Sequence, residues 1–196
     1  MNADMPSRKT IVIGGSYPGA LSAWFRDKYP NIATASWAAS AVVQPLADMW
    51  SYDEQVYLST HNIGPYCSET LVRMNVYATE QGILRNSGQP NAIDSIIVGT
   101  DAEGMLTTDF LSYVGDFPAG QVQYGSSKSF CESLLPLVPL SDAEVFSTMI
   151  QASIALGDTP EGYDSRSGSK VDSKVIDVDY SGRSWTYQYC TEFGWF

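Results

Sequence analysis

A serine among glycines near the start of the chain has the surroundings of a hydrolase nucleophile. The run Gly14-Gly15-Ser16-Tyr17-Pro18-Gly19 follows a short β-branched run and opens a segment with helical spacing. A serine on a tight strand-to-helix turn exposes its hydroxyl above the carboxyl edge of the sheet, and small neighbours prevent clashes there. The backbone N–H of Tyr17 would point at the same place and could stabilise an oxyanion.

The same six residues allow a plainer interpretation. They match Gly-x-Ser-x-Gly imperfectly, because Pro18 stands where the second glycine is usual and Gly19 follows one position later. Short motifs of this kind also arise by chance. A glycine turn between a strand and a helix is therefore the alternative to a nucleophile elbow.

The flanking segments predict a strand–turn–helix–strand unit. Residues 11–13 form a compact apolar run closed by glycines, which is typical of a buried strand in a parallel sheet. Residues 18–29 have helical spacing and end at Pro30, and the alanine-rich stretch 32–43 predicts the next strand. Such a unit cannot cover both faces of its strands by itself, so we expect the chain as given to be poorly stable.

Residues 46–156 predict a mostly helical region without repeats, followed by a mobile loop over the polar stretch 157–173. The last helix is opened by a capping box at Ser141 and Glu144 and is ended by Gly157. The expected helices are 46–58, a helix from an N-cap at Ser68 to about Arg85, 108–113, 120–135 and 141–156.

Composition and charge exclude several classes of function. Hydrophobic residues make up 44% and charged residues 17% of the chain, as in globular proteins. The formal net charge of −11 repels phosphate backbones and anionic membrane surfaces, so we expect no nucleic-acid binding. No apolar run approaches the roughly 18–20 residues of a membrane-spanning helix, and the polar residues 1–9 predict no signal peptide.

Cysteine and histidine usage argues against a metal centre. Cys67, Cys131 and Cys190 are compatible with one disulfide and a leftover thiol in an oxidising compartment, or with three free thiols in the cytosol. His61 is the single histidine, and no Cys-x-x-C motif occurs. We therefore expect neither a metal nor a cofactor.

Beyond the elbow, the sequence resembles the serine exopeptidase family of lysosomal Pro-X carboxypeptidase, dipeptidyl peptidase II and thymus-specific serine protease. The matching islands keep the family's order: 14–19, 23–26, 28–30, 39–41, 64–69, Asp116, 123–125, 131–132 and 185–194. The resemblance implies an α/β fold made of a partial α/β-hydrolase core at 1–45, a mostly helical insertion (cap) domain at 46–180, and the start of a return segment toward the core at 181–196.

The resemblance implies a serine peptidase that cleaves next to proline at one end of a peptide. Ser16 would be the nucleophile, a histidine would take its proton, and an aspartate would orient the imidazole. In the family these two partners lie beyond the segment matched at 185–194. The sequence thus resembles an internal piece of a longer protein, with little expected peptidase activity alone. We expect His61 to be an exposed loop histidine, not the base.

The same islands supply candidates for substrate binding: Tyr187, Gln188, Glu192 and Asp116. A carboxylate near the cleft could bind a peptide's free amine. The aromatic residues Trp185, Tyr187 and Tyr189 could help to wall a proline pocket. Structural acids and an ordinary packing cluster between cap and core are the alternatives.

The resemblance further implies a disulfide between Cys67 and Cys131, an unpaired thiol at Cys190, a lysosomal, vesicular or secreted location, and a homodimer for the full-length protein. The partner is expected to be a peptide substrate. Two other functions remain open: a non-catalytic α/β-hydrolase-like binding module, and a hydrolase of another ester or amide.

Overall fold

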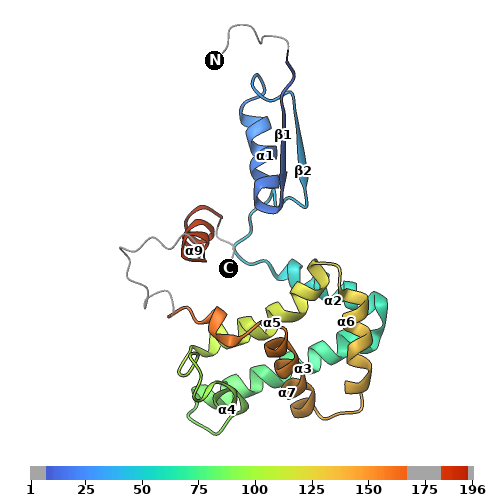
Figure 1. Cartoon of the computed structure of the whole chain (residues 1–196), viewed down its shortest axis with the longest axis vertical. Coiled ribbons are helices and arrows are strands. Elements are labelled where there is room, and N and C mark those ends of the chain that lie inside the picture. The colour runs from blue at the N-terminus through green and yellow to red at the C-terminus, as the bar shows by residue number, and fades with distance from the viewer. Residues whose placement is uncertain (1–7, 167–181, 194–196) are drawn as a thin grey trace. The chain divides into compact units, whose positions relative to one another are not determined.

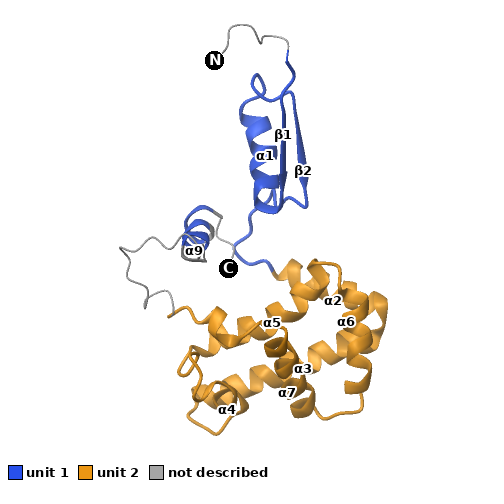
Figure 2. Cartoon of the chain, viewed as in Figure 1, with its two compact units in different colours: residues 1–49, 184–196 blue, residues 50–183 orange. Residues whose placement is uncertain are grey.

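The computed structural model describes residues 8–166 and 182–193. The chain forms two compact units (Figure 2): unit 1 comprises residues 1–49 and 184–196, and unit 2 comprises residues 50–183. Unit 1 holds a small parallel sheet and unit 2 is helical, which agrees with an α/β fold. Within the described residues, no helix combines the length and the apolar character needed to cross a bilayer.

Unit 1 contains two parallel strands and a helix between them (Figure 1). Strand β1 (Ile11–Gly15) leads directly into α1 (Ser16–Lys28), and the chain returns through β2 (Ala35–Ala39). The register pairs Ile11 with Ala35 at one end and Gly15 with Ala39 at the other. Helix α1 packs against both strands, so the carboxyl ends of the strands and the start of α1 meet at the same edge.

Strand β2 is shorter than the predicted strand over 32–43. Before it, the Ala33 amide donates to the Tyr29 carbonyl at 3.1 Å. This hydrogen bond closes a turn, so Ala33 does not pair with the neighbouring strand. After it, Ser40 has φ 45°, a left-handed conformation that ends the extended backbone. The prediction was wrong at both ends because a run of apolar residues does not show where the backbone turns.

One face of this sheet is uncovered in the described part of unit 1. Ile11, Ile13 and Trp37 are 60%, 69% and 66% exposed. Ile13 and Trp37 are paired in the register and so share that face. A two-stranded sheet with one packed helix thus leaves a large apolar surface facing solvent.

Unit 2 is built around its longest helix, α3, which contacts most of the other helices of the unit. Its core comes chiefly from α3, α5 and α7, with Met74, Phe110, Tyr113 and Phe146 almost fully buried. The elements are α2 (Trp50–Ile63), α3 (Pro65–Asn86), α4 (Ala92–Ile97), α5 (Thr107–Gln123), α6 (Ser127–Leu134), the short helix η1 (Leu135–Leu137), α7 (Asp142–Ala155) and the short helix η2 (Pro160–Tyr163).

The predicted helix over 46–58 and the predicted cap at Ser68 are both displaced. Helix α2 starts at Trp50 and runs to Ile63, and α3 already begins at Pro65. Proline suits the first position of a helix because its missing N–H has no partner there anyway. Ser68 is therefore inside α3, where its hydroxyl donates to the Pro65 carbonyl at 3.0 Å.

Helix α5 joins the predicted helix 108–113 to the first residues of the predicted helix 120–135, and most of the latter forms the separate helix α6. Helix α5 continues through the buried Pro118 and ends before Gly125, whose φ is 84°. A proline removes one backbone donor from a helix, but here its ring packs in the interior. The capping box that opens α7 is confirmed: Ser141 accepts from the Glu144 amide, and Glu144 accepts from the Ser141 amide at 2.9 Å.

Part of the predicted loop over 157–173 is anchored. In residues 157–166 the chain forms η2, the Tyr163 ring packs on Tyr113 with centroids 5.4 Å apart, and the Ser165 amide donates to Asp109 at 3.0 Å. The prediction of a mobile loop was wrong for this part. The rest, 167–173, lies outside the described residues.

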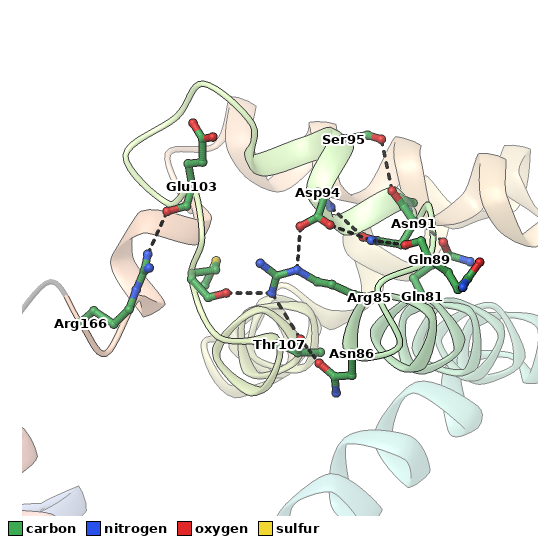
Figure 3. Close-up of polar contacts among 12 residues, drawn as sticks. Gln81, Arg85, Asn86, Gln89, Asn91, Asp94, Ser95, Glu103, Thr107 and Arg166 are labelled. Carbon is green, nitrogen blue, oxygen red and sulfur yellow. Dashed lines mark hydrogen bonds and ion pairs between the residues drawn. The ribbon is translucent and has the colours of Figure 1, made fainter.

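Arg85 holds the connection between α3 and α5, a segment that contains the unpredicted helix α4 (Figure 3). Its guanidinium donates to Asp94 Oδ1 and to the Met105 carbonyl, both at 2.7 Å. Asn91 caps α4 by accepting from the Asp94 amide at 2.8 Å. Hydrogen bonds from Asn91 and Arg85 lower the pKa of Asp94. These polar contacts fix a helix that is too short to be stable alone.

Candidate active site

Ser16 stands at a sharp turn where β1 passes into α1. It is the first residue of α1, it follows the last residue of β1 directly, and its side chain is exposed. Its φ of 58° lies in the left-handed region, which costs a non-glycine residue about 1–2 kcal/mol. A strained serine on a strand-to-helix turn is the backbone geometry of a nucleophile elbow.

Two glycines make this turn possible. A Cβ on Gly14 would lie 2.0 Å from the carbonyl oxygen of Pro18, and a Cβ on Gly19 would lie 2.9 Å from the carbonyl oxygen of Ala39. Both distances are far below ordinary contact, so α1 approaches β1 and β2 closely only because these side chains are absent. At Gly15 the nearest such atom is 3.9 Å away, so this position has room for a methyl group.

The Tyr17 amide belongs to the first turn of α1. The first N–H groups of a helix point away from the helix's own carbonyls, and the helix dipole favours negative charge at that end. The amide that follows Ser16 is thus placed where it could stabilise an oxyanion formed by attack of the Ser16 hydroxyl.

The Tyr17 side chain contacts the C-terminal part of unit 1, which contains most of α9 (Gly182–Gln188) and the short π-helix η3 (Tyr189–Phe193). Its hydroxyl donates to Glu192 Oε2 at 3.0 Å, and its ring meets the Trp185 ring edge-on, with centroids 5.8 Å apart. Partial desolvation and the hydrogen bond to Glu192 raise the pKa of Tyr17, which keeps the phenol protonated as a donor.

The structure thus places the Glu192 carboxylate in contact with Tyr17, the residue that follows Ser16. Tyr187, another candidate, is 68% exposed, and Gln188 is exposed as well. Cys190, in the same segment, is a free and exposed thiol.

Ser40 lies at the same edge of the sheet and was not singled out in the sequence. Gly15 and Ala39 are paired in the register, so Ser16 and Ser40 directly follow neighbouring positions on adjacent strands. Ser40 is exposed, and it is the second described non-glycine residue with positive φ. Residue type gave no signal for this conformation, because serine seldom adopts it.

Asp116 belongs to α5 in unit 2 and has acidic neighbours. Its carboxyl accepts a hydrogen bond from Tyr163. Partial desolvation, followed by the charges of Asp158 and Asp53, raises the pKa of Asp116. Burial and the nearby Asp116 raise the pKa of Tyr163 as well, so that phenol stays a donor.

His61 is not the exposed loop histidine expected from the sequence. It lies in the last turn of α2, is partly buried and stacks on the Tyr57 ring, with centroids 5.6 Å apart. Its Nδ1 is 3.0 Å from the Ser68 hydroxyl, which itself donates to the Pro65 carbonyl. Through this contact His61 links α2 to α3.

Unit 2 also contains the disulfide. Cys67 in α3 and Cys131 in α6 are bonded, 64 residues apart in sequence, and both are fully buried. Among residues 8–166 and 182–193, no three or more His, Cys, Asp or Glu side chains gather closely enough to hold a metal ion.

Comparison with known proteins gives one family. A family model described as serine carboxypeptidase S28 matches residues 1–196. A relative from Arabidopsis thaliana, named "probable serine protease EDA2", is 31% identical over 93% of this chain and 36% of its own length. The mouse thymus-specific serine protease is 28% identical over 95% of this chain and 40% of its own length.

A shorter stretch matches another relative at higher identity. The mouse lysosomal Pro-X carboxypeptidase is 47% identical over 64 residues, which is 31% of this chain and 13% of that protein. The chain thus spans well under half the length of these relatives. No solved structure matches it.

Proposed function

Because the chain belongs to the serine carboxypeptidase S28 family, we propose that it carries the nucleophile of a serine-type peptidase, and that this nucleophile is Ser16. The observation that supports this best is the exposed serine at φ 58° between β1 and α1. On this proposal unit 1 is part of an α/β-hydrolase core and unit 2 is the helical domain inserted into it.

The reaction proposed for Ser16 is acyl transfer. The Ser16 hydroxyl oxygen attacks the carbonyl carbon of a peptide bond while a base takes the hydroxyl proton. The Tyr17 amide stabilises the oxyanion, the carbon–nitrogen bond breaks, and the leaving amine takes up the proton. Water then hydrolyses the ester on Ser16 and releases the acid.

The base proposed for this step is a histidine outside the 196 residues, oriented by an aspartate. His61 is the single histidine of the chain, and its Nδ1 is engaged with Ser68 in unit 2. In the family resemblance both partners of the serine follow the segment matched at 185–194. We therefore expect the 196-residue chain alone to turn over peptides slowly or not at all.

The substrate proposed is a peptide cleaved next to proline near one of its ends. One relative is named for Pro-X carboxypeptidase activity. The aromatic pair of Tyr17 and Trp185, next to the nucleophile, offers faces on which a proline ring can pack. Glu192, held by the Tyr17 hydroxyl, places a carboxylate beside this pair that could bind a free amine. Tyr187 and Gln188 would line the same region.

Asp116 is a weaker candidate for the amine. Its carboxyl accepts from Tyr163, and its raised pKa leaves a larger neutral fraction at mildly acid pH. We also propose a lysosomal or secreted location, because relatives are named lysosomal and extracellular and because a disulfide persists in oxidising compartments.

The test is labelling by a fluorophosphonate, which reacts with activated serines. The chain is expressed together with any coding sequence that adjoins it in its gene, as wild type, Ser16→Ala and Ser51→Ala, the last being an exposed serine of α2. We expect labelling of the wild type and Ser51→Ala and none of Ser16→Ala. Labelling that persists in Ser16→Ala would contradict the assignment, and no labelling of any form would favour a non-catalytic binding module.

Substrate class is tested on the unlabelled wild-type protein, because the fluorophosphonate blocks the serine with which it reacts. Peptides blocked at the amino or at the carboxyl end separate carboxypeptidase from aminopeptidase action. Peptides with alanine in place of proline show the proline preference directly. Equal cleavage of both sequences would favour a hydrolase of another amide or ester.

A further inference from the structure

Unit 2 contains a pocket of about 420 Å³ between α2, α3 and α5. Its walls are largely apolar and include Val56, Leu71, Val76 and Pro118. The volume falls in the lower part of the range of small-molecule sites, roughly 300–1,000 Å³. All the lining residues belong to unit 2, so the pocket needs nothing from the turn at Ser16.

The polar groups that line the pocket differ in what they can offer a ligand. Thr60 donates to the Val56 and Tyr57 carbonyls, both at 2.9 Å, and Ser68 donates to the Pro65 carbonyl. These two hydroxyl protons are already used inside the helices. A ligand that needs a donor therefore finds neither of them available.

Asp53 and Asn75 offer acceptors instead. Asp53 is exposed and lines the pocket, and among the described residues it takes part in none of the ion pairs or side-chain hydrogen bonds. Asn75 uses its amide nitrogen to donate to the Leu71 carbonyl at 3.0 Å, which leaves the amide oxygen for another partner. Tyr57 adds an aromatic ring to the same lining. A carboxylate, an amide oxygen and an aromatic ring suit a cation.

The surrounding charge favours the same class of ligand. Acidic residues greatly outnumber basic ones over residues 50–166. Arg73, Arg85 and Arg166 pair with other carboxylates at 2.6–2.8 Å. The field of Asp53 also reaches Asp116, whose pKa it helps to raise. Low-dielectric walls around uncompensated negative charge attract cations from solution.

We infer that this pocket binds a small organic cation, namely a primary ammonium group on an apolar body. The ammonium lies at Asp53 and the Asn75 oxygen, and the apolar body lies against Val56, Leu71 and Val76. The ligand is either a free amine or the lysine side chain of a peptide, which share this chemistry. The site goes beyond the proposed function, because it involves no step at Ser16.

The binding test uses the 196-residue chain labelled with ¹⁵N, titrated with benzylammonium at pH 7 and low salt. We expect saturable shifts of amides in α2, α3 and α5, and at least tenfold weaker binding of benzyl alcohol, which has the same shape without the charge. Equal affinity for the two would overturn the cation assignment. Shifts that do not saturate, or that appear elsewhere, would overturn the site.

Matched variants locate the site. Asp53→Asn should weaken benzylammonium binding at least tenfold, whereas Glu54→Gln, which removes the neighbouring charge of α2 outside the pocket, should leave it unchanged. Val76→Phe should block the pocket, whereas Ile83→Phe, an exposed change on the same helix, should not. Equal losses within either pair would contradict the inference, and the spectrum of each variant shows whether it is folded.

A lysine derivative blocked at both ends distinguishes the two sources of the ammonium group. Binding at least as tight as that of benzylammonium supports a peptide side chain, and much weaker binding supports a free amine. Because the readout is binding, it is independent of fluorophosphonate labelling. Failure at one site therefore leaves the conclusion about the other intact.

Discussion

Gly14→Ala tests whether the close approach of α1 to β1 creates the turn at Ser16. The added Cβ would lie 2.0 Å from the Pro18 carbonyl oxygen and 2.3 Å from its carbon. Both are backbone atoms in the first turn of α1, so no side chain can rotate to make room. The helix must move away from the strand, and Ser16 moves with it.

The size of the effect follows from this rigidity. Extra methyl groups in packed interiors cost roughly 1–3 kcal/mol when neighbouring side chains can adjust. Here the obstacle is backbone, so we expect a cost of about 3 kcal/mol at the upper end of that range. Since 1.4 kcal/mol is a factor of ten, local opening of unit 1 should become about a hundredfold more frequent.

Hydrogen–deuterium exchange of the β1 and β2 amides measures this opening in the 196-residue chain. Gly15→Ala is the matched control, because the nearest atom to its Cβ is 3.9 Å away and its φ of −119° suits any residue. We expect fast exchange in Gly14→Ala and exchange near wild type in Gly15→Ala. Protection of β1 in Gly14→Ala equal to that of wild type, or equal disruption by both changes, would refute the steric argument.

Three further predictions concern unit 2, and each is measured by urea unfolding followed by circular dichroism. Reducing the Cys67–Cys131 disulfide, which spans 64 residues of sequence, should lower the free energy of unfolding by about 4 kcal/mol through the loop entropy of the unfolded chain; a change below 1 kcal/mol would contradict this. Ser141→Ala should cost about 1 kcal/mol by removing the capping box of α7, whereas Ser147→Ala on the same helix should cost far less. The pKa of Asp116 is raised in the folded state, so this state binds the proton more tightly than the unfolded chain does. The contribution of Asp116 to stability therefore falls as pH rises from about 4 through the raised pKa, and Asp116→Asn should flatten this pH dependence.

The strand-to-helix turn at Ser16 could be predicted from sequence because its determinants are local. A β-branched run, two glycines, a serine and a helical pattern are adjacent in the chain, and glycine is required where Cβ atoms would clash. The capping box of α7 was predictable for the same reason, since Ser141 and Glu144 are three residues apart. The α4 cap at Asn91 followed the same pattern, with Asp94 three residues on, and could have been found.

Other features depended on contacts that local patterns do not encode. Tyr17 and Glu192 are 175 residues apart in sequence and meet through one hydrogen bond. His61 was expected in a loop beyond the predicted helix 46–58, yet α2 continues to Ile63. Residues 114–119 were predicted to separate two helices, whereas α5 continues through them with Pro118 buried inside it. In each case packing overrode the local preference.

If Ser16 is the nucleophile, as we propose, the geometry around it sets its position but not its activation. Gly14 and Gly19 allow the turn, and the strained φ fixes the exposed hydroxyl beside the amide that follows it. These features determine where an acyl group would be attached and where its oxyanion would lie. They do not lower the pKa of the hydroxyl, for which a base is needed. Residues 14–19 position the Ser16 hydroxyl without any contribution from the base. A base supplied by another part of the protein would therefore only have to take the hydroxyl proton, and labelling of Ser16 by a fluorophosphonate shows whether such a base is present.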